Sequence, residues 1–402
     1  MSKRVKGGIT APQGFVAAGM HSGIKKTKQL DLTMIMSEKP GPIAGVFTSN
    51  RLPAAPVILD RLYLKRGMGQ AFIINSGNAN AFTGQEGLAH AREMGQRVAD
   101  QLIIPLHHVF IGSTGVIGVP LPISAIRSGI PILISRLRKA GHREAAKAIM
   151  TTDTCPKEIA IQDRIGGKTV TIGGIAKGSG MIHPDMATML AYITTDAAID
   201  QKTLQATFRA VTKQTFNCIS VDGETSTNDT ALCLANGKAG NLTIKTGTTA
   251  HGKFEALLFQ VCHHLAMEIV RDGEGATKII EFQITQASSD RAAKQFANTL
   301  ATSPLVKTAI FGTDPNWGRI VAALGRADAP VKAEKLLIEF NKIPIVQNGK
   351  GLGPQVERRI KQEMKKPFLT ISISLGMGKG SSKIWTTDLT YDYVKINASY
   401  RS

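Results

Sequence analysis

Short apolar, β-branched runs alternate with helical patterns along the whole sequence, and this alternation restricts the possible folds more than any other feature. Stretches typical of strands occur at residues 41–48 (GPIAGVFT), 70–75 (QAFIIN), 168–175 (KTVTIGGI), 189–193, 278–284, 335–340, 367–375 (PFLTISISL) and 392–397 (DYVKIN). Helical periodicity occurs at residues 86–102, 121–148, 203–216 and 254–272. Elements that alternate in this way predict a layered α/β fold.

Glycine and proline indicate where these elements are interrupted. The region 121–148 is expected to form one or two helices with a break at 129–131, which contains both residues. The tetrapeptide NSGN at 75–78 is typical of a turn before the helix that starts near residue 86. A Gly-Gly pair is expected to break the strand at 168–175.

The bulk composition is that of an ordinary globular protein, with 402 residues, 43% apolar and 20% charged. No stretch of about 18 apolar residues predicts a membrane span. The basic N-terminus is not followed by the apolar region of a secretory signal. The four cysteines are widely spaced and form no CxxC pair, which favours thiols in a reducing compartment. We therefore expect a cytoplasmic protein that does not enter a membrane.

The formal net charge of +19 is the unusual bulk property, with 49 Lys and Arg residues against 30 Asp and Glu. Such a charge suits nucleic acid, a membrane surface or small anionic substrates. The basic residues are dispersed, and their densest run, at 136–147, is typical of a solvated helix face. Aromatic residues make up only 5%, without the glycine–aromatic pattern of RNA-binding modules. A nucleic-acid partner is thus not expected, and nucleic-acid binding is kept only as the alternative from a different class.

The sequence lacks the common motifs for phosphate binding, serine hydrolysis and metal binding. A phosphate loop ending at Gly167-Lys168-Thr169 requires glycine at position 162, which is Gln162. Ser179 lacks the GxSxG frame of a serine hydrolase. Neither adjacent histidine pair, at 107–108 and 263–264, has the spacing of a metal clamp, so no metal site is expected.

Two segments retain a possible chemical role. The first, GSTGVIG at 112–118, is either a glycine turn or an oxyanion site, in which a hydroxyl and a backbone N–H stabilise negative charge on a carbonyl oxygen. The second, KGSGMIHPDMATML at 177–190, places Thr188 between a glycine-containing stretch and an apolar run. Periodicity by itself would make Thr188 a structural residue.

The segment 177–191 resembles the cleavage and active-site segment of the ornithine acetyltransferases (glutamate N-acetyltransferases) of arginine biosynthesis, whose pattern is approximately GSGMIxPxMATMLA. Further segments resemble the same family in the same order, and they lie at 11–19 (APQGFVAAG), 45–56 (GVFTSNRLPAAP), 75–84 (NSGNANAFTG), 151–157 (TTDTCPK), 222–229 (DGETSTND), 271–278 (RDGEGATK), 314–320 (DPNWGRI) and 393–397 (YVKIN). The resemblance covers essentially the whole chain.

This resemblance implies a self-cleaving enzyme with an N-terminal threonine nucleophile. The cut would fall between Ala187 and Thr188, giving an alpha fragment, 1–187, and a beta fragment, 188–402. The alpha fragment would carry the oxyanion donors, the Thr114 hydroxyl and the Gly115 backbone N–H. Thr188 would then transfer acetyl from N-acetyl-L-ornithine to L-glutamate in a ping-pong reaction.

The resemblance also implies a substrate site, a fold and an assembly. The substrate contacts implied are Thr154, Lys177, Thr188, Glu274, Asn397 and Ser402, with Thr152 as the alternative to Thr154. No cofactor is implied, and whether acetyl-CoA serves as a second acetyl donor is left open. The expected fold is an α/β/β/α arrangement with mixed sheets, shared with self-processing aminopeptidases. Two alpha and two beta fragments are expected to assemble.

The sequence departs from the family pattern at three positions. Phe82 stands where a small residue is expected, Ser399 replaces an acidic residue, and Ser402 replaces a threonine. The departures at Ser399 and Ser402 affect only the substrate contacts expected from the C-terminal segment. The alternative enzyme is a related self-processing amidohydrolase or aminopeptidase, in which water replaces glutamate as the acceptor.

Overall fold

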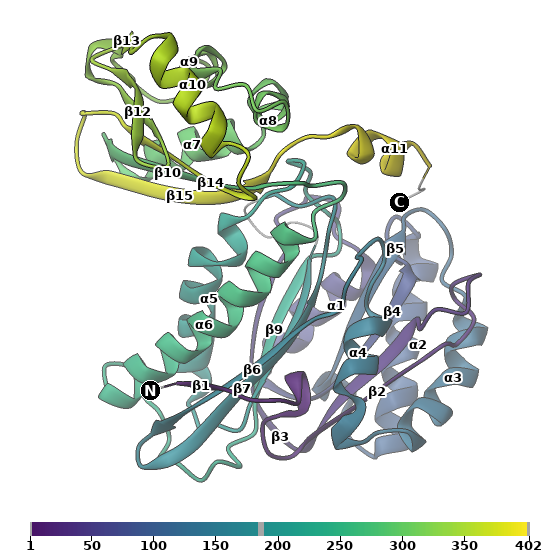
Figure 1. The fold of residues 1–402 in the computed structure, drawn as a ribbon. Helices are drawn as coiled ribbons and strands as arrows, with labels where there is room; N and C mark the ends of the chain where they lie inside the picture. The colour runs from purple at the N-terminus through teal and green to yellow at the C-terminus, as the bar shows by residue number, and fades with distance from the viewer. Residues whose placement is uncertain (1, 184–188, 400–402) are drawn as a thin grey trace.

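The computed structural model describes residues 2–183 and 189–399, and within them the chain forms a larger and a smaller unit (Figure 1). The larger unit contains a nine-stranded sheet in the described residues, in the order β1-β6-β7-β8-β9-β3-β4-β5 with β2 paired to β3. Its strands are β1 (Lys3–Arg4), β2 (Phe15–Met20), β3 (Leu32–Phe47), β4 (Met68–Asn78), β5 (Val109–Val116), β6 (Lys157–Ile165), β7 (Lys168–Lys177), β8 (Leu190–Thr195) and β9 (Thr230–Ala235). Its helices are α1 (Ala55–Leu64), α2 (Gly84–Leu102), α3 (Ile123–Ser135), α4 (His142–Ala148), α5 (Gln201–Gln214) and α6 (Thr249–Arg271).

The long strand β3 divides the larger sheet into two halves that pack against each other. Its first part pairs with β2 and β4, and its last part, residues 43–47, pairs with β9. Phe72 of β4 packs on Tyr192 of β8 with ring centroids 5.2 Å apart. Helices α5 and α6 cover the outer face of one half, while α2 and α3 lie outside the other (Figure 1). The expected α/β/β/α arrangement is thereby confirmed.

Strand β8 shows why its short apolar run is so continuous. Leu190 and Tyr192 pack in the core between the two half-sheets, whereas Ala191 and Ile193 pack under helices α5 and α6. Successive side chains of a strand point to opposite faces, so a strand buried on both faces needs apolar residues at every position. β8 also pairs with β7, so strands from both sides of the expected 187/188 cut are neighbours in one sheet.

The smaller unit has its own sheet and core. In the described residues it contains six strands in the order β13-β12-β11-β14-β10-β15. These are β10 (Ile279–Ala287), β11 (Leu337–Phe340), β12 (Ile343–Gln347), β13 (Lys350–Gly351), β14 (Phe368–Ser374) and β15 (Gly380–Thr387), with helices α7 (Asp290–Ala301), α8 (Pro304–Phe311), α9 (Trp317–Gly325) and α10 (Pro354–Glu363). A last helix, α11 (Tyr391–Ser399), returns to the larger unit (Figure 1). No linker composition marks this division in the sequence, and it does not coincide with residues 187/188.

A stability prediction follows from the core of the smaller unit. Phe296 of α7 is fully buried there, so Phe296→Ala is expected to destabilise this unit by about 3–5 kcal/mol through lost apolar contacts and a residual cavity. The matched control is Phe368→Ala, because Phe368 is 42% exposed. Urea unfolding followed by fluorescence measures both variants, and equal unfolding midpoints would contradict the prediction.

The strand predicted at 392–397 is wrong, because this stretch lies in helix α11. The alternation of Val394 and Ile396 suggested a strand, but Val394 is 62% exposed and no described residue of α11 is buried. The hydroxyl of Thr390 accepts a hydrogen bond from the Tyr393 N–H at 3.2 Å, as an N-cap does. A helix satisfies its own backbone groups, and none of the described residues of α11 takes part in a sheet.

Three expected breaks also differ from the structure. Helix α3 continues through Pro131 because Ile126, Ile130 and Leu133 keep its face in the core, and the chain leaves the helix only after Ser135. The tetrapeptide 75–78 is the end of β4, where β5 supplies a parallel partner. Strand β7 runs unbroken through its Gly-Gly pair, since β6 and β8 pair on both sides.

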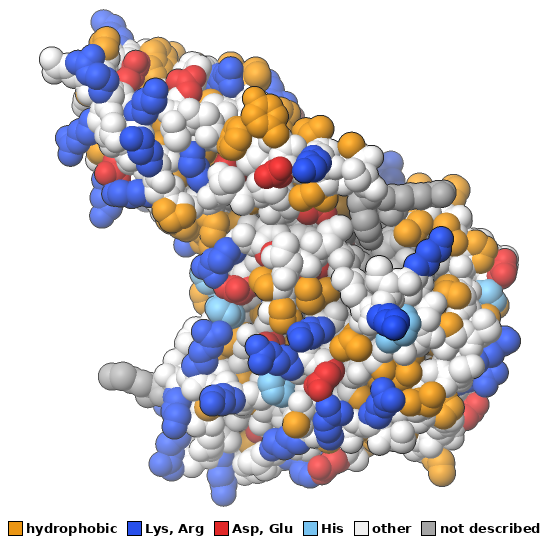
Figure 2. Space-filling model, turned by 45° about the vertical axis from the view of Figure 1, so that its right-hand side comes forward, with side chains coloured by type: hydrophobic (Ala, Val, Ile, Leu, Met, Phe, Trp, Pro, Cys, Tyr) orange, Lys and Arg blue, Asp and Glu red, His pale blue; other side chains and the backbone are white. Residues whose placement is uncertain are grey.

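Lys and Arg side chains are dispersed over both units on the face shown in Figure 2, and they do not gather into one patch. Among the helices of the described residues, none is long and apolar enough to cross a membrane.

Candidate active site

A cavity lies where the ends of β5 and β7, several loops and helix α11 come together. The described residues that line it are Ala79, Thr114, Gly115, Ile117, Thr151, Thr152, Lys177, Gly180, Met181, Asp222, Glu224, Ser226, Asn228, Glu274, Tyr393 and Asn397. They come from segments far apart in the sequence. The cavity therefore brings together five of the residues predicted from the sequence: Thr114, Gly115, Lys177, Glu274 and Asn397.

Thr114 and Gly115 are held at the end of β5 by the parallel strand β4. Gly115 has a φ of +131°, and a Cβ atom there would lie 2.4 Å from the carbonyl carbon of Gly77. Only glycine allows this close approach of the two backbones. Asn228 holds the same corner, because its side-chain amide donates to the carbonyls of Ala79 (2.6 Å) and Ser113 (2.8 Å). The segment is therefore rigid, as an oxyanion site requires.

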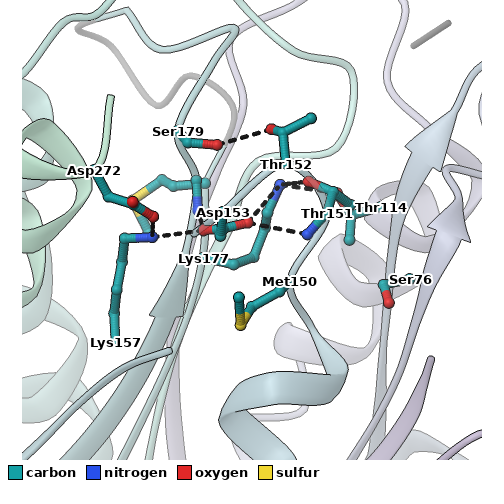
Figure 3. Close-up of polar contacts among 12 residues, drawn as sticks. Ser76, Thr114, Met150, Thr151, Thr152, Asp153, Lys157, Lys177, Ser179 and Asp272 are labelled. Carbon is teal, nitrogen blue, oxygen red and sulfur yellow. Dashed lines mark hydrogen bonds and ion pairs between the residues drawn. The ribbon is translucent and has the colours of Figure 1, made fainter. Parts of the chain in front are cut away.

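Lys177, the last residue of β7, points toward Thr114 and Thr151 (Figure 3). Its Nζ donates to Thr151 Oγ1 at 2.7 Å and lies 3.4 Å from Thr114 Oγ1. A threonine hydroxyl that accepts from an ammonium keeps its own proton for another acceptor. Burial lowers the pKa of Lys177, and the charge of Asp153 opposes that shift.

Glu274 follows α6 and lies close against the glycine-containing loop after β7. A Cβ atom on Gly180 would lie 2.3 Å from a carboxylate oxygen of Glu274, so a larger residue at this loop position would displace the Glu274 carboxylate. The side-chain amide of Asn397 donates to Glu274 Oε2 at 2.8 Å. Helix α11 is thereby fastened over the cavity at Glu274.

Thr154 and Thr152 have different environments. Thr154 is exposed, and both its N–H and its hydroxyl donate to Asp272. Thr152 lines the cavity, and its hydroxyl forms a 2.8 Å hydrogen bond with that of Ser179. In the part of the chain that the structure describes, Thr152 is thus the one of the two that faces the cavity.

Ala187, Thr188 and Ser402 lie outside the described residues. Two carboxylates hold the chain on either side of 184–188. Asp222 accepts from the N–H groups of Met181 (2.6 Å) and Ile182 (2.9 Å), and Asp229 accepts from the Met189 N–H at 2.8 Å. Burial raises the pKa of Asp222 and places that of Asp229 well above its usual range.

The sequence analysis missed Thr151, Asp222, Asn228 and Tyr393 as parts of this site. Asp222 also accepts from the Tyr393 hydroxyl at 3.2 Å, which is a second link between α11 and the larger unit. All four belong to segments that carried the family resemblance, namely 151–157, 222–229 and 393–397. That resemblance is the signal by which they could have been found.

The arrangement suits a small zwitterionic substrate. One cavity offers a buried cation, a set of hydroxyl groups and the carboxylates of Asp222, Glu224 and Glu274. A substrate carboxylate and a substrate ammonium can each find an opposite charge there. Among the described residues, no group of three or more His, Cys, Asp or Glu side chains is arranged to hold a metal ion.

Comparison with known proteins shows the family of this chain. The family model described as the ArgJ family matches residues 16–402. The arginine biosynthesis bifunctional protein ArgJ of Geobacter sulfurreducens is 47% identical over 97% of this chain and 99% of its own length. The protein of the same name from Oceanobacillus iheyensis is 47% identical over 98% and 97%. Ornithine acetyltransferase from Mycobacterium tuberculosis, solved in complex with ornithine, is 39% identical over 46% of this chain and 98% of that chain, with a TM-score of 0.43.

Proposed function

The chain belongs to the ArgJ family, and on that premise we propose that it transfers an acetyl group from N-acetyl-L-ornithine to L-glutamate in arginine biosynthesis. The observation that carries the proposal is the cavity in which Lys177 reaches Thr114 while Glu274 presents a carboxylate. An acylated diamino acid has both a carboxylate and an ammonium to match these groups.

The enzyme first cleaves its own chain. The Thr188 hydroxyl attacks the carbonyl carbon of Ala187, the peptide C–N bond breaks, and an ester joins the two fragments. Water then hydrolyses this ester and leaves a free hydroxyl and a free α-amine on Thr188. An unperturbed α-amine has a pKa of about 7.7–8.0, so it can act as the base for its own hydroxyl near neutral pH.

Acetyl transfer then proceeds in two half-reactions. The Thr188 hydroxyl attacks the acetyl carbonyl of N-acetylornithine, the amide C–N bond breaks, and the leaving amine of ornithine takes the proton. The amine of glutamate attacks the resulting acetyl-threonine ester, which forms N-acetylglutamate and restores the hydroxyl. Thr114 and Gly115 stabilise the oxyanion in both half-reactions.

The remaining groups bind the substrate. Lys177 faces its carboxylate, Glu274 and Asn397 hold its ammonium end, and Ser402 closes the site from the C-terminus. Of the two alternatives Thr152 and Thr154, the cavity-lining position of Thr152 supports a direct contact, while Thr154 supports the loop through Asp272. A cytoplasmic location and a tetramer of two alpha and two beta fragments complete the proposal.

The test combines fragment masses with a transfer assay. Denatured purified protein should give two fragments, one beginning Thr-Met-Leu-Ala, and should form N-acetylglutamate from N-acetylornithine and glutamate. Release of acetate that does not depend on glutamate would favour the amidohydrolase alternative. Since the curated relatives are called bifunctional, the same assay with acetyl-CoA in place of N-acetylornithine decides whether acetyl-CoA is a second donor.

Glu274→Gln tests the substrate site separately. This variant keeps the shape of the side chain but loses its charge, so KM for N-acetylornithine should rise about ten- to a hundredfold through loss of a charge-assisted hydrogen bond. Glu224→Gln is the matched comparison, because Glu224 lines the same cavity but is exposed, so loss of its charge should raise KM less. Steady-state kinetics measure both variants, and an unchanged KM in Glu274→Gln would remove Glu274 from substrate binding.

A further inference from the structure

Four buried charged side chains form a row of alternating sign that starts at the cavity and runs away from it, in the order Lys177, Asp153, Lys157 and Asp272 (Figure 3). We propose that Lys157, which does not line the cavity, is a positioning residue for acetyl transfer. By binding Asp153 at closer range it keeps the ion pair between Asp153 and Lys177 long, at 4.0 Å, and so leaves Lys177 directed at Thr114. This inference rests on the proposed function and adds a residue to it.

The distances distinguish the two lysines. Lys157 Nζ lies 2.7 Å from Asp153 Oδ1 and 2.6 Å from Asp272 Oδ2, and its side chain is fully buried. Lys177 Nζ lies 4.0 Å from Asp153 Oδ2, but only 2.7 Å from Thr151 Oγ1. Asp153 is therefore paired closely with Lys157 and only loosely with Lys177.

Backbone groups fix the Asp153 carboxylate in this position. Oδ1 accepts from the Gly178 N–H at 2.7 Å, and Oδ2 accepts from the Thr151 N–H at 3.0 Å. Asp153 thus joins the end of β7, where Lys177 lies, to the loop that carries Thr151. Asp272, at the end of α6, accepts from Thr154 and fastens the other end of that loop. Lys157 is the link between the two carboxylates.

The charges around Asp153 reinforce this arrangement. Burial would raise the pKa of Asp153, but the charges of Lys177 and Lys157 outweigh it and lower the pKa to about 2. Asp153 is therefore an anion at any working pH and attracts whichever cation is free to approach it. The groups whose charges act on Lys177 are Asp153, Lys157, Glu274, Asp229 and Lys25.

Removal of Lys157 would leave Lys177 as the nearest cation to Asp153. The Lys177 ammonium would then move toward Asp153 and away from Thr114, and its pKa would rise because an opposite charge stabilises the protonated form. Two effects follow for the reaction. Turnover falls because Lys177 and Thr114 lose their alignment, and the alkaline limb of the pH profile moves to higher pH because Lys177 keeps its proton longer.

The experiment uses variants that keep the buried charge balanced. Lys157→Met combined with Asp272→Asn removes one positive and one negative charge, whereas Lys157→Met alone would leave an uncompensated buried carboxylate. We expect the double variant to lower kcat about ten- to a hundredfold, as misplacement of a group by about 1 Å can. We also expect its alkaline limb in kcat/KM to shift upward by about one pH unit.

Two controls isolate the role of Lys157. Asp272→Asn alone keeps the contact between Lys157 and Asp153. Its kcat should stay within about threefold of the wild type, and its alkaline limb should stay at the wild-type pH. Lys157→Arg keeps the positive charge, and should keep the wild-type alkaline limb. Circular dichroism and thermal melting establish that each variant is folded. A folded double variant with the wild-type rate and pH profile would overturn the proposal and leave Lys157 a purely structural role.

The wild-type enzyme separates this inference from the proposed function. If it releases acetate from N-acetylornithine without transfer to glutamate, the proposed acceptor is wrong. The same pH profiles, recorded on acetate release, still decide the role of Lys157.

Discussion

Replacement of Thr188 by alanine is expected to give a single uncut chain without acetyl transfer. The variant lacks the hydroxyl that attacks the Ala187 carbonyl, and it also lacks the nucleophile for the acetyl group. Loss of the nucleophile in a well-studied hydrolase lowers kcat on the order of 10⁶-fold, so activity should fall to the assay background. Mass spectrometry of the denatured protein and a transfer assay measure the two losses independently.

Thr188→Ser is the matched control, because it keeps a hydroxyl in the same position. We expect it to cleave and to transfer acetyl, with both steps slower than in the wild type. The flanking chain should be unaffected in both variants, since the groups that donate to Asp222 and Asp229 there are the backbone N–H groups of Met181, Ile182 and Met189. A Thr188→Ala protein that is cut and active would refute the proposed nucleophile.

Replacement of Thr114 by valine is expected to lower kcat about 100- to 1000-fold, the usual effect of removing one oxyanion donor. Valine has nearly the shape of threonine but no hydroxyl, so the backbone fixed by Gly115 and Asn228 should remain in place. Self-cleavage should slow as well, because it passes through an oxyanion on the Ala187 carbonyl. Single-turnover acetylation of the enzyme by N-acetylornithine isolates the first half-reaction.

The serine variant at this position, Thr114→Ser, should recover most of the rate, because its hydroxyl can accept from Lys177 and donate to the oxyanion. Valine and serine variants of equal activity would mean that the hydroxyl has no part in catalysis. Wild-type rates of both cleavage and transfer in Thr114→Val would remove Thr114 from the oxyanion role.

The elements of this fold followed from local sequence patterns where packing agreed with propensity. β14 alternates exposed and buried residues as its sequence does, and β8 is apolar at each position because both of its faces are buried. The prediction failed at 392–397, where β-branched residues alternate but the chain forms helix α11, outside both sheets. The sequence pattern also predicted a helix break at 129–131, but α3 continues to Ser135, because its core contacts compensate for the backbone hydrogen bond that Pro131 cannot make.

Part of the candidate site could also be predicted from the sequence. The ordered motifs of the sequence determined the family, and with it the expected roles of Thr114, Gly115, Lys177 and Glu274. The nucleophile and both tail contacts at Ser402 and Asn397 came from the same source, and only Asn397 among these lies in the described residues.

The sequence by itself therefore determined most of the elements and the family that the chain joins, because periodicity and motif order are local properties that the residues carry with them. Only the tertiary structure decided which residues meet. Lys157 and Asp272 are 115 positions apart, yet they form a 2.6 Å ion pair. Asp153 lies between Lys157 and Lys177. A buried charge is stable only beside its partner, and that partner is chosen by the packing of β6, β7 and α6.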